Sequence, residues 1–254
     1  MVLPVLCNRR YHCHHFRIML KNPIVHAAIF QLPDLEVNVE EDILLFDKPY
    51  QCTSFDMVGK VRGIVQRKAN RKVKVGHAGT LDPLATGLLI ICVGKMTKRI
   101  DQIQQQVKEY TGTFRLGATT PSFDLEHPVD AVYPYEHITE EMAKEAAQRF
   151  TGDLEQVPPI FSAVRHNGHR AYVFARKGEE ARLETKKITI YDFELTRFAL
   201  PDIDFRIRCS KGTYIRSVAR DFGAALDSGA HLTALRRTMI GDYHVDDAIK
   251  PILQ

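Results

Sequence analysis

Residues 76–87 read Gly-His-Ala-Gly-Thr-Leu-Asp-Pro-Leu-Ala-Thr-Gly and contain a single acid, Asp82. Pro83 follows that acid directly, and a proline disfavours the helical conformation for the residue before it. The glycines of this stretch allow tight turns and a close approach of the backbone to other groups. We therefore expect Asp82 to lie on a rigid loop, where either a chemical role or an Asx-turn would account for it.

Short strands are expected on both sides of this loop. Residues 72–75 alternate between lysine and valine, and the apolar run at 88–93 is typical of a buried strand. Further strands are predicted at 43–46, 108–116, 186–198, 203–209 and 236–245. Because no regular βαβ repeat appears among them, the pattern predicts an α+β domain around a largely antiparallel or mixed sheet.

Helices are predicted between these strands. Ser54 is the expected N-cap of one helix, whose inner face carries Phe55, Val58, Val61, Ile64 and Val65. A second helix is expected to begin after Thr139, and a third to be opened by Gly212.

The composition is that of an ordinary globular protein. The 254 residues are 44% hydrophobic and 26% charged, with a formal net charge of +4, which is compatible with a polyanionic partner. The five cysteines are scattered, and Cys92 and Cys209 lie in apolar runs as core residues would. A disulfide framework is therefore disfavoured, a cytoplasmic location is expected, and no apolar run is long enough to span a membrane.

Residues 1–40 differ from the rest and are expected to form a disordered or loosely attached extension. Cys7 and Cys13 lie among histidines, but no second Cys/His pair follows at zinc-site spacing, so no metal is expected. Met19 is an alternative start of the chain.

The residues alone do not decide the chemistry. Arg216 could pair with a carboxylate, although in isolation a surface or helix-capping role is at least as good an explanation. His77 has no nucleophile motif or ligand spacing around it, which disfavours serine-hydrolase and zinc-enzyme readings. Lysines and arginines at 60–74 form either a solvated face or a surface for phosphates.

Five ordered segments carry a more specific signal. They are VGHAGTLDPLATGLLIICVGKMTK (75–98), KEYTGTFRLGATTPSFD (108–124), QVPPIFSAVRHNGHRAYVFARKG (156–178), CSKGTYIRSVARDFG (209–223) and GAHLTALRRTMIGDY (229–243). Together, from about residue 43 to 248, they resemble the TruB-type family of bacterial tRNA pseudouridine synthases.

This resemblance implies a pseudouridine synthase fold and the isomerisation of uridine 55 in the T-loop of tRNA, with no cofactor or metal. It makes Asp82 the catalytic nucleophile, and leaves open whether the carboxylate attacks the sugar or the base first. Arg216 falls where an arginine pairs with that aspartate, and Tyr110 where an aromatic ring stacks on the target base. Tyr214 and Leu235 fall at pocket-lining positions, and His77 where a histidine enters the T-loop and helps to hold the base extruded.

The resemblance also implies a domain organisation. We expect a catalytic domain at 41–254 with an RNA-binding insertion at about 121–178, in which Arg165 and Lys177 are candidate phosphate contacts. The C-terminal PUA domain of many family members is expected to be missing or very reduced. The expected partner is tRNA. The protein itself is expected to be a monomer, with no obligate protein partner and no membrane association. Two alternatives remain: a tRNA-binding or tRNA-folding protein with secondary catalysis, and an RNA-guided pseudouridylase.

Overall fold

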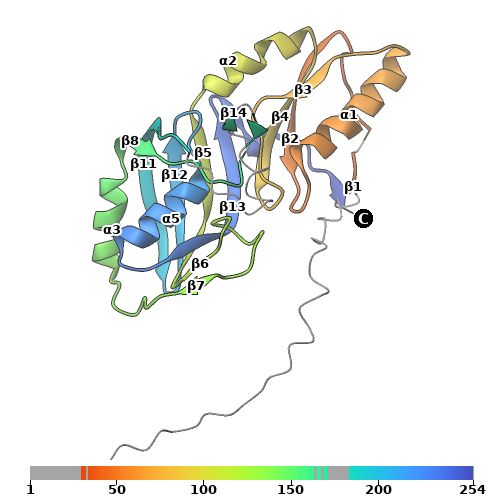
Figure 1. Cartoon of the computed structure of the whole chain (residues 1–254). Helices are drawn as coiled ribbons and strands as arrows, with labels where there is room; N and C mark the ends of the chain where they lie inside the picture. The colour runs from red at the N-terminus through yellow and green to blue at the C-terminus, as the bar shows by residue number, and fades with distance from the viewer. Residues whose placement is uncertain (1–29, 33, 163–164, 167–168, 171–182, 254) are drawn as a thin grey trace, which may run out of the picture.

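A nine-stranded mixed sheet forms the centre of the fold in a computed structural model that describes residues 30–32, 34–162, 165–166, 169–170 and 183–253 (Figure 1). Its main path runs β2-β4-β13-β5-β12-β11-β8, with β3 paired to β4 and β14 to β13. The strands of this sheet are β2 (Glu41–Lys48), β3 (Val75–His77), β4 (Thr86–Gly94), β5 (Lys108–Leu116), β8 (Gly152–Gln156), β11 (Lys186–Ala199), β12 (Asp202–Cys209), β13 (Ala230–Ile240) and β14 (Tyr243–His244). All of its pairings are antiparallel except the one between β4 and β13, so the predicted α+β class with a mixed, largely antiparallel sheet is confirmed.

Helices and small strand pairs surround this sheet. The helices are α1 (Ser54–Ala69), α2 (Ile100–Gln105), α3 (Glu140–Arg149) and α5 (Ile215–Ala225), with 3₁₀ turns η1 (Lys95–Arg99) and η2 (Val245–Asp247). The small pairs are β1 (Phe30–Gln31) with β15 (Ile252–Leu253), β6 (Ala118–Thr119) with β7 (Ala131–Val132), and β9 (Arg165–His166) with β10 (His169–Arg170).

The sheet consists of two halves joined at one short seam. β4 pairs with β2 along eight residues, but with β13 only at Arg236–Thr86 and Arg237–Gly87. The half containing β2, β3 and β4 packs its apolar side chains against α1 (Figure 1). The half containing β5, β12 and β11 packs against α3 and α5, with Phe114 stacked 4.1 Å from Phe205 between ring centroids. A third cluster packs across the seam, with Leu88 and Ile90 of β4 against Ile103 of α2 and Ile240 of β13.

β4 shows why an unbroken apolar run was the right signal for a central strand. Every residue from Leu88 to Val93 is 0% exposed, because one face packs against α1 and the other against α2 and the C-terminal segment. A strand buried on both faces cannot alternate between polar and apolar residues. Cys92 and Cys209 are both buried, as expected.

Three boundaries differ from the expectations. α1 is capped by Thr53, not by Ser54, and its buried face runs through Met57, Val58 and Val61, which leaves Phe55 68% exposed. The strand expected at 72–75 begins only at Val75. The strand expected at 236–245 begins six residues earlier, at Ala230, and a turn separates it from β14.

The packed region also begins before residue 41. Phe30 is 1% exposed within the core around α1, and Val37 is buried in the same core. Loose attachment was therefore the wrong expectation for the described residues between 30 and 40, because β1 supplies a core side chain. Residues 1–29, with Cys7, Cys13 and Met19, lie outside the described residues.

Candidate active site

Asp82 lies on the loop between β3 and β4, as its proline neighbour predicted. Ser54, at the start of α1, holds the residue just before the acid. Its hydroxyl accepts the Leu81 N–H at 2.9 Å and donates to the Leu81 carbonyl at 3.1 Å. The Asp82 side chain is 38% exposed, so a carboxylate on a fixed backbone faces the solvent-accessible side of this loop.

Lys48 holds the other side of the acid. This lysine ends β2 and is 0% exposed. Its ammonium donates to the carbonyls of Cys52 at 2.6 Å, Pro49 at 2.9 Å and Pro83 at 3.3 Å. Burial lowers the pKa of Lys48 to about 8, because a charged ammonium loses its hydration there.

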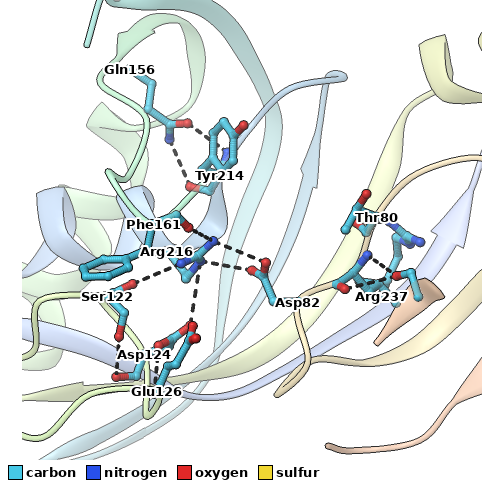
Figure 2. A network of polar contacts seen from close by, with 12 residues as sticks. Thr80, Asp82, Ser122, Asp124, Glu126, Gln156, Phe161, Tyr214, Arg216 and Arg237 are labelled. Atoms are coloured by element: carbon cyan, nitrogen blue, oxygen red, sulfur yellow. Dashed lines mark hydrogen bonds and ion pairs between the residues drawn. The ribbon is translucent and has the colours of Figure 1, made fainter. Parts of the chain in front are cut away.

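Arg216 forms a two-pronged ion pair with Asp82 (Figure 2). Its Nε lies 3.0 Å from one carboxylate oxygen, and its Nη2 donates to the other at 3.2 Å. The same guanidinium donates to the carbonyls of Phe161 at 3.0 Å and Ser122 at 3.4 Å, and lies 3.8 Å from Asp124. Because Arg216 is 5% exposed and bonded on all sides, it presents Asp82 in one orientation.

The first turn of α5 is fixed by a glutamine from β8. The side chain of Gln156 accepts the Tyr214 N–H at 2.8 Å and donates to the Tyr214 carbonyl at 3.1 Å (Figure 2). Tyr214 is the N-cap residue of α5, and Gly212 before it has φ +85°, a conformation that favours glycine. This bracing sets the position of Arg216 two residues later.

A cavity of about 370 Å³ opens beside the ion pair. Asp82, Tyr110, Tyr214, Arg216 and Leu235 all line it, although they come from four separate parts of the chain. Burial raises the pKa of Tyr110 and of Tyr214, so both phenols are neutral and uncharged near neutral pH. The cavity is of the size that holds small ligands, and it offers aromatic and aliphatic walls with one carboxylate.

His77 lies at the end of β3, outside the lining of this cavity. Its Nδ1 is buried without a hydrogen-bond partner in the described part of the chain. Burial, reinforced by the charge of Arg237, lowers the pKa of His77, which favours a neutral imidazole. Of the two candidate phosphate contacts, Lys177 lies outside the described residues, as does the side chain of Arg165.

Several residues at the site were not singled out from the sequence. Gln156, Asp124 and Arg237 all fall inside the five quoted segments, but nothing in the local pattern separates them from ordinary polar residues. A signal did exist for Arg237: in a strand, adjacent residues point to opposite faces, so one of the paired arginines at 236 and 237 had to point inward. Lys48 lies outside the segments, and only its burial marks it.

Within the described ranges, no group of three or more His, Cys, Asp or Glu side chains is arranged to hold a metal ion. In the same part of the chain, no helix combines the length and apolar character needed to cross a membrane.

Comparisons with known proteins identify similar sequences and folds. The profile of the TruB family pseudouridylate synthase N-terminal domain matches residues 66–215. A protein of Flavobacterium johnsoniae named tRNA pseudouridine synthase B is 56% identical over 216 residues, covering 84% of this chain and 94% of its own. One of the same name from Phocaeicola vulgatus is 57% identical over 211 residues, covering 83% and 90%.

A solved structure shares the fold. The structure described as a Cbf5-Nop10-Gar1 complex contains a chain that matches with a TM-score of 0.58 at 24% identity. The match covers 87% of this chain and 60% of that one. Since the family profile covers more than half of the sequence and the relatives exceed half identity, this chain belongs to the TruB family of pseudouridylate synthases.

Proposed function

We propose that this protein isomerises uridine 55 in the T-loop of tRNA to pseudouridine, with Asp82 as the catalytic carboxylate. The observation that carries the proposal is the half-exposed Asp82 carboxylate, held on both oxygens by the buried Arg216 at the wall of a ligand-sized cavity. Relatives more than half identical are named tRNA pseudouridine synthase B, which supports tRNA as the substrate.

The reaction needs little more than this arrangement. The bond between N1 of uracil and C1′ of ribose breaks, the base turns, and a bond forms between C5 and C1′. A proton leaves C5 and a proton is taken up at N1, so atoms and electrons balance without an oxidant or reductant. An ionised Asp82 can act as the nucleophile or stabilise positive character at the sugar, and Arg216 holds both of its oxygens in one orientation.

The remaining cavity residues suit a flipped base. In this proposal Tyr110 stacks on the uracil, while Tyr214 and Leu235 form the other walls of the pocket. His77 enters the T-loop and occupies the space that the base has left. Extruding a base costs a few kcal/mol, which contacts of this kind offset.

Cationic side chains at the end of the β3–β4 pair opposite to Asp82 would bind the backbone of the RNA. Between the loop after α1 and η1 lies a groove of about 300 Å³ that is lined by Arg71, Lys72, Lys74, Lys95 and Lys98. Glu40 pairs with Arg71 in this groove, and the other cations suit phosphates, since single-strand loops are held by backbone contacts as well as by stacking. Residues 41–254 would act as the catalytic domain, with about 121–178 closing over the RNA.

The test is turnover of an unmodified tRNA transcript, scored by mapping pseudouridine along the molecule. Asp82→Asn should lower the rate of isomerisation by at least about a thousandfold, because the amide is neither a nucleophile nor a counter-charge. Asp101→Asn, at an exposed acid on α2, is the matched control and should behave as the wild type. Normal turnover by Asp82→Asn, or pseudouridine at another position only, would contradict the proposal.

A further inference from the structure

The seam between the two halves of the sheet passes through the proposed active site. Asp82 lies on the connection between β3 and β4, and its neighbours Leu81 and Ala85 pack into the core around β5 and α5, the elements that carry Tyr110 and Arg216. The distance from the carboxylate to its arginine and to the stacking ring therefore depends on how the halves are joined. β4 and β13 share only two residue pairs there.

Arg237 occupies that seam. On one side it pairs in the sheet with Gly87 of β4, and on the other with Tyr110 of β5. Gly87 has φ +100°, and a Cβ at that position would lie 2.2 Å from the Arg237 carbonyl oxygen. The two strands therefore approach each other more closely than any side chain at position 87 would permit.

The side chain of Arg237 crosses the seam into the loop of the acid. Its Nε donates to the Leu88 carbonyl at 2.8 Å, its Nη2 to the Gly79 carbonyl at 3.1 Å, and its Nη1 to the Thr80 carbonyl at 3.4 Å. Figure 2 labels Arg237 and Thr80. These three carbonyls lie before and after Asp82 in the chain, so one guanidinium holds both ends of its loop.

Arg237 is also an unusual buried charge. It is 1% exposed, and no carboxylate among the residues with described positions forms an ion pair with it. Burying a cation with only carbonyl groups and the neutral Tyr110 phenol as partners is costly, because no carboxylate offsets the lost hydration. The neighbouring Arg236 offers the contrast, because it forms a two-pronged pair with Asp47, at 2.8 and 2.9 Å.

We propose that Arg237 is a positioning residue for the reaction: it clamps the Asp82 loop of one half of the sheet onto the strand that carries the other half. The expected effect on the rate of isomerisation rests on the proposed function. The expected effect on the Asp82 loop rests only on the contacts of Arg237. A shift of the loop by a fraction of an ångström would misalign the carboxylate. Because Arg237 also lines the cavity, the lysine substitution is chosen to leave a cation at that wall.

Arg237→Lys is the main variant, since an ammonium keeps the charge but cannot reach three carbonyls as the planar fork does. Arg236→Lys is the matched control, because the same substitution on the adjacent residue loosens a contact between the same halves away from the cavity. The substrate is a T-arm hairpin carrying [5-³H]uridine at the target position, which releases tritium when C5 bonds to the sugar. Single-turnover release gives the rate, and fluorescence anisotropy of a labelled hairpin gives the Kd.

For Arg237→Lys, we expect a rate about tenfold or more below wild type, with a Kd within about twofold. Amide hydrogen exchange in residues 79–88 should be faster in this variant than in Arg236→Lys. The positioning role is overturned if rate and exchange match the wild type, if the loss lies in Kd, or if Arg236→Lys loses as much. It is also overturned if both Arg237→Lys and Arg237→Gln fail to fold while Arg236→Lys folds. A wild type that releases no tritium contradicts the proposed function instead, and the exchange measurement then still decides the role of Arg237.

Discussion

Replacing Arg216 with methionine separates the structural from the chemical role of the ion pair. Methionine retains approximately the apolar stem of the arginine side chain and removes the guanidinium. Asp124, whose side chain is 9% exposed, then loses its cation, and the carbonyls of Phe161 and Ser122 lose a donor. Asp82 is affected less, because its 38% exposed carboxylate can turn to water.

These burials set the expected magnitudes. Removing one partner of a buried ion pair costs about 3–5 kcal/mol, whereas a half-exposed pair contributes about 1 kcal/mol or less. We therefore expect Arg216→Met to lower the free energy of unfolding by about 3 kcal/mol, and Asp82→Asn to lower it by about 1 kcal/mol. Adding Asp124→Asn to Arg216→Met should recover about 1–2 kcal/mol, because the stranded charge is then gone.

The assay is equilibrium unfolding in urea at pH 7, with the m-value checked for a constant two-state transition. Both single variants should lose isomerisation, yet only Arg216→Met should lose substantial stability. Two outcomes would contradict this division of roles: Asp82→Asn destabilises the fold as much as Arg216→Met, or Asp124→Asn deepens the loss of stability in the double variant.

Three further variants test the packing around the site. Lys48→Met tests how stability depends on pH. Because burial lowers the pKa of Lys48 in the folded protein to about 8 from 10.5, the unfolded chain binds more protons between these two pH values. The stability of the wild type relative to Lys48→Met should accordingly rise from pH 8 to pH 10, by up to about 3 kcal/mol, and a flat or falling difference in urea titrations would contradict this. Gly87→Ala should lower the free energy of unfolding by about 2–4 kcal/mol, because residue 87 has φ +100° and its Cβ would meet the carbonyl of Arg237. A loss under about 1 kcal/mol in urea titrations would mean that the strands separate easily. Phe114→Ala removes a fully buried ring that stacks on Phe205 and should lower the free energy of unfolding by about 3–5 kcal/mol. Thermal unfolding measures this loss, and an unchanged Tm would contradict the role of Phe114 in the core.

Local chemistry predicted part of the fold well. The proline after Asp82 placed the acid on a loop, and strict patterns identified β4, β5 and the β11–β12 pair. The first half of β13 was missed, because its burial follows no simple alternation: it lies centrally in the sheet and meets α5 as well as β5. Phe55 was assigned to the inner face, but the buried stripe of α1 runs through Ser54, Met57, Val58, Val61 and Val65, and Phe55 lies at its edge.

The site illustrates a different limit. Asp82, Tyr110, Tyr214, Arg216 and Leu235 were brought together only through family resemblance, and the structure does bring them to one cavity. Their proximity could not be read from the sequence itself, since it depends on strand order and on the narrow join between β4 and β13. The supports of the site, such as Gln156 and Lys48, act through backbone carbonyls and amides, and a sequence does not show which backbone groups lack partners.

The division of the sheet also has a temporal meaning during synthesis. Asp82 and Arg216 are separated by 134 positions in the chain, so the loop of the acid leaves the ribosome long before its arginine does. The α1 half forms its local contacts early, but its core also takes Ile249, and β1 pairs with β15, so both halves are completed only by the late part of the chain. The newborn chain thus carries an incomplete active site until the last joining step, and competence for catalysis coincides with completion of the fold.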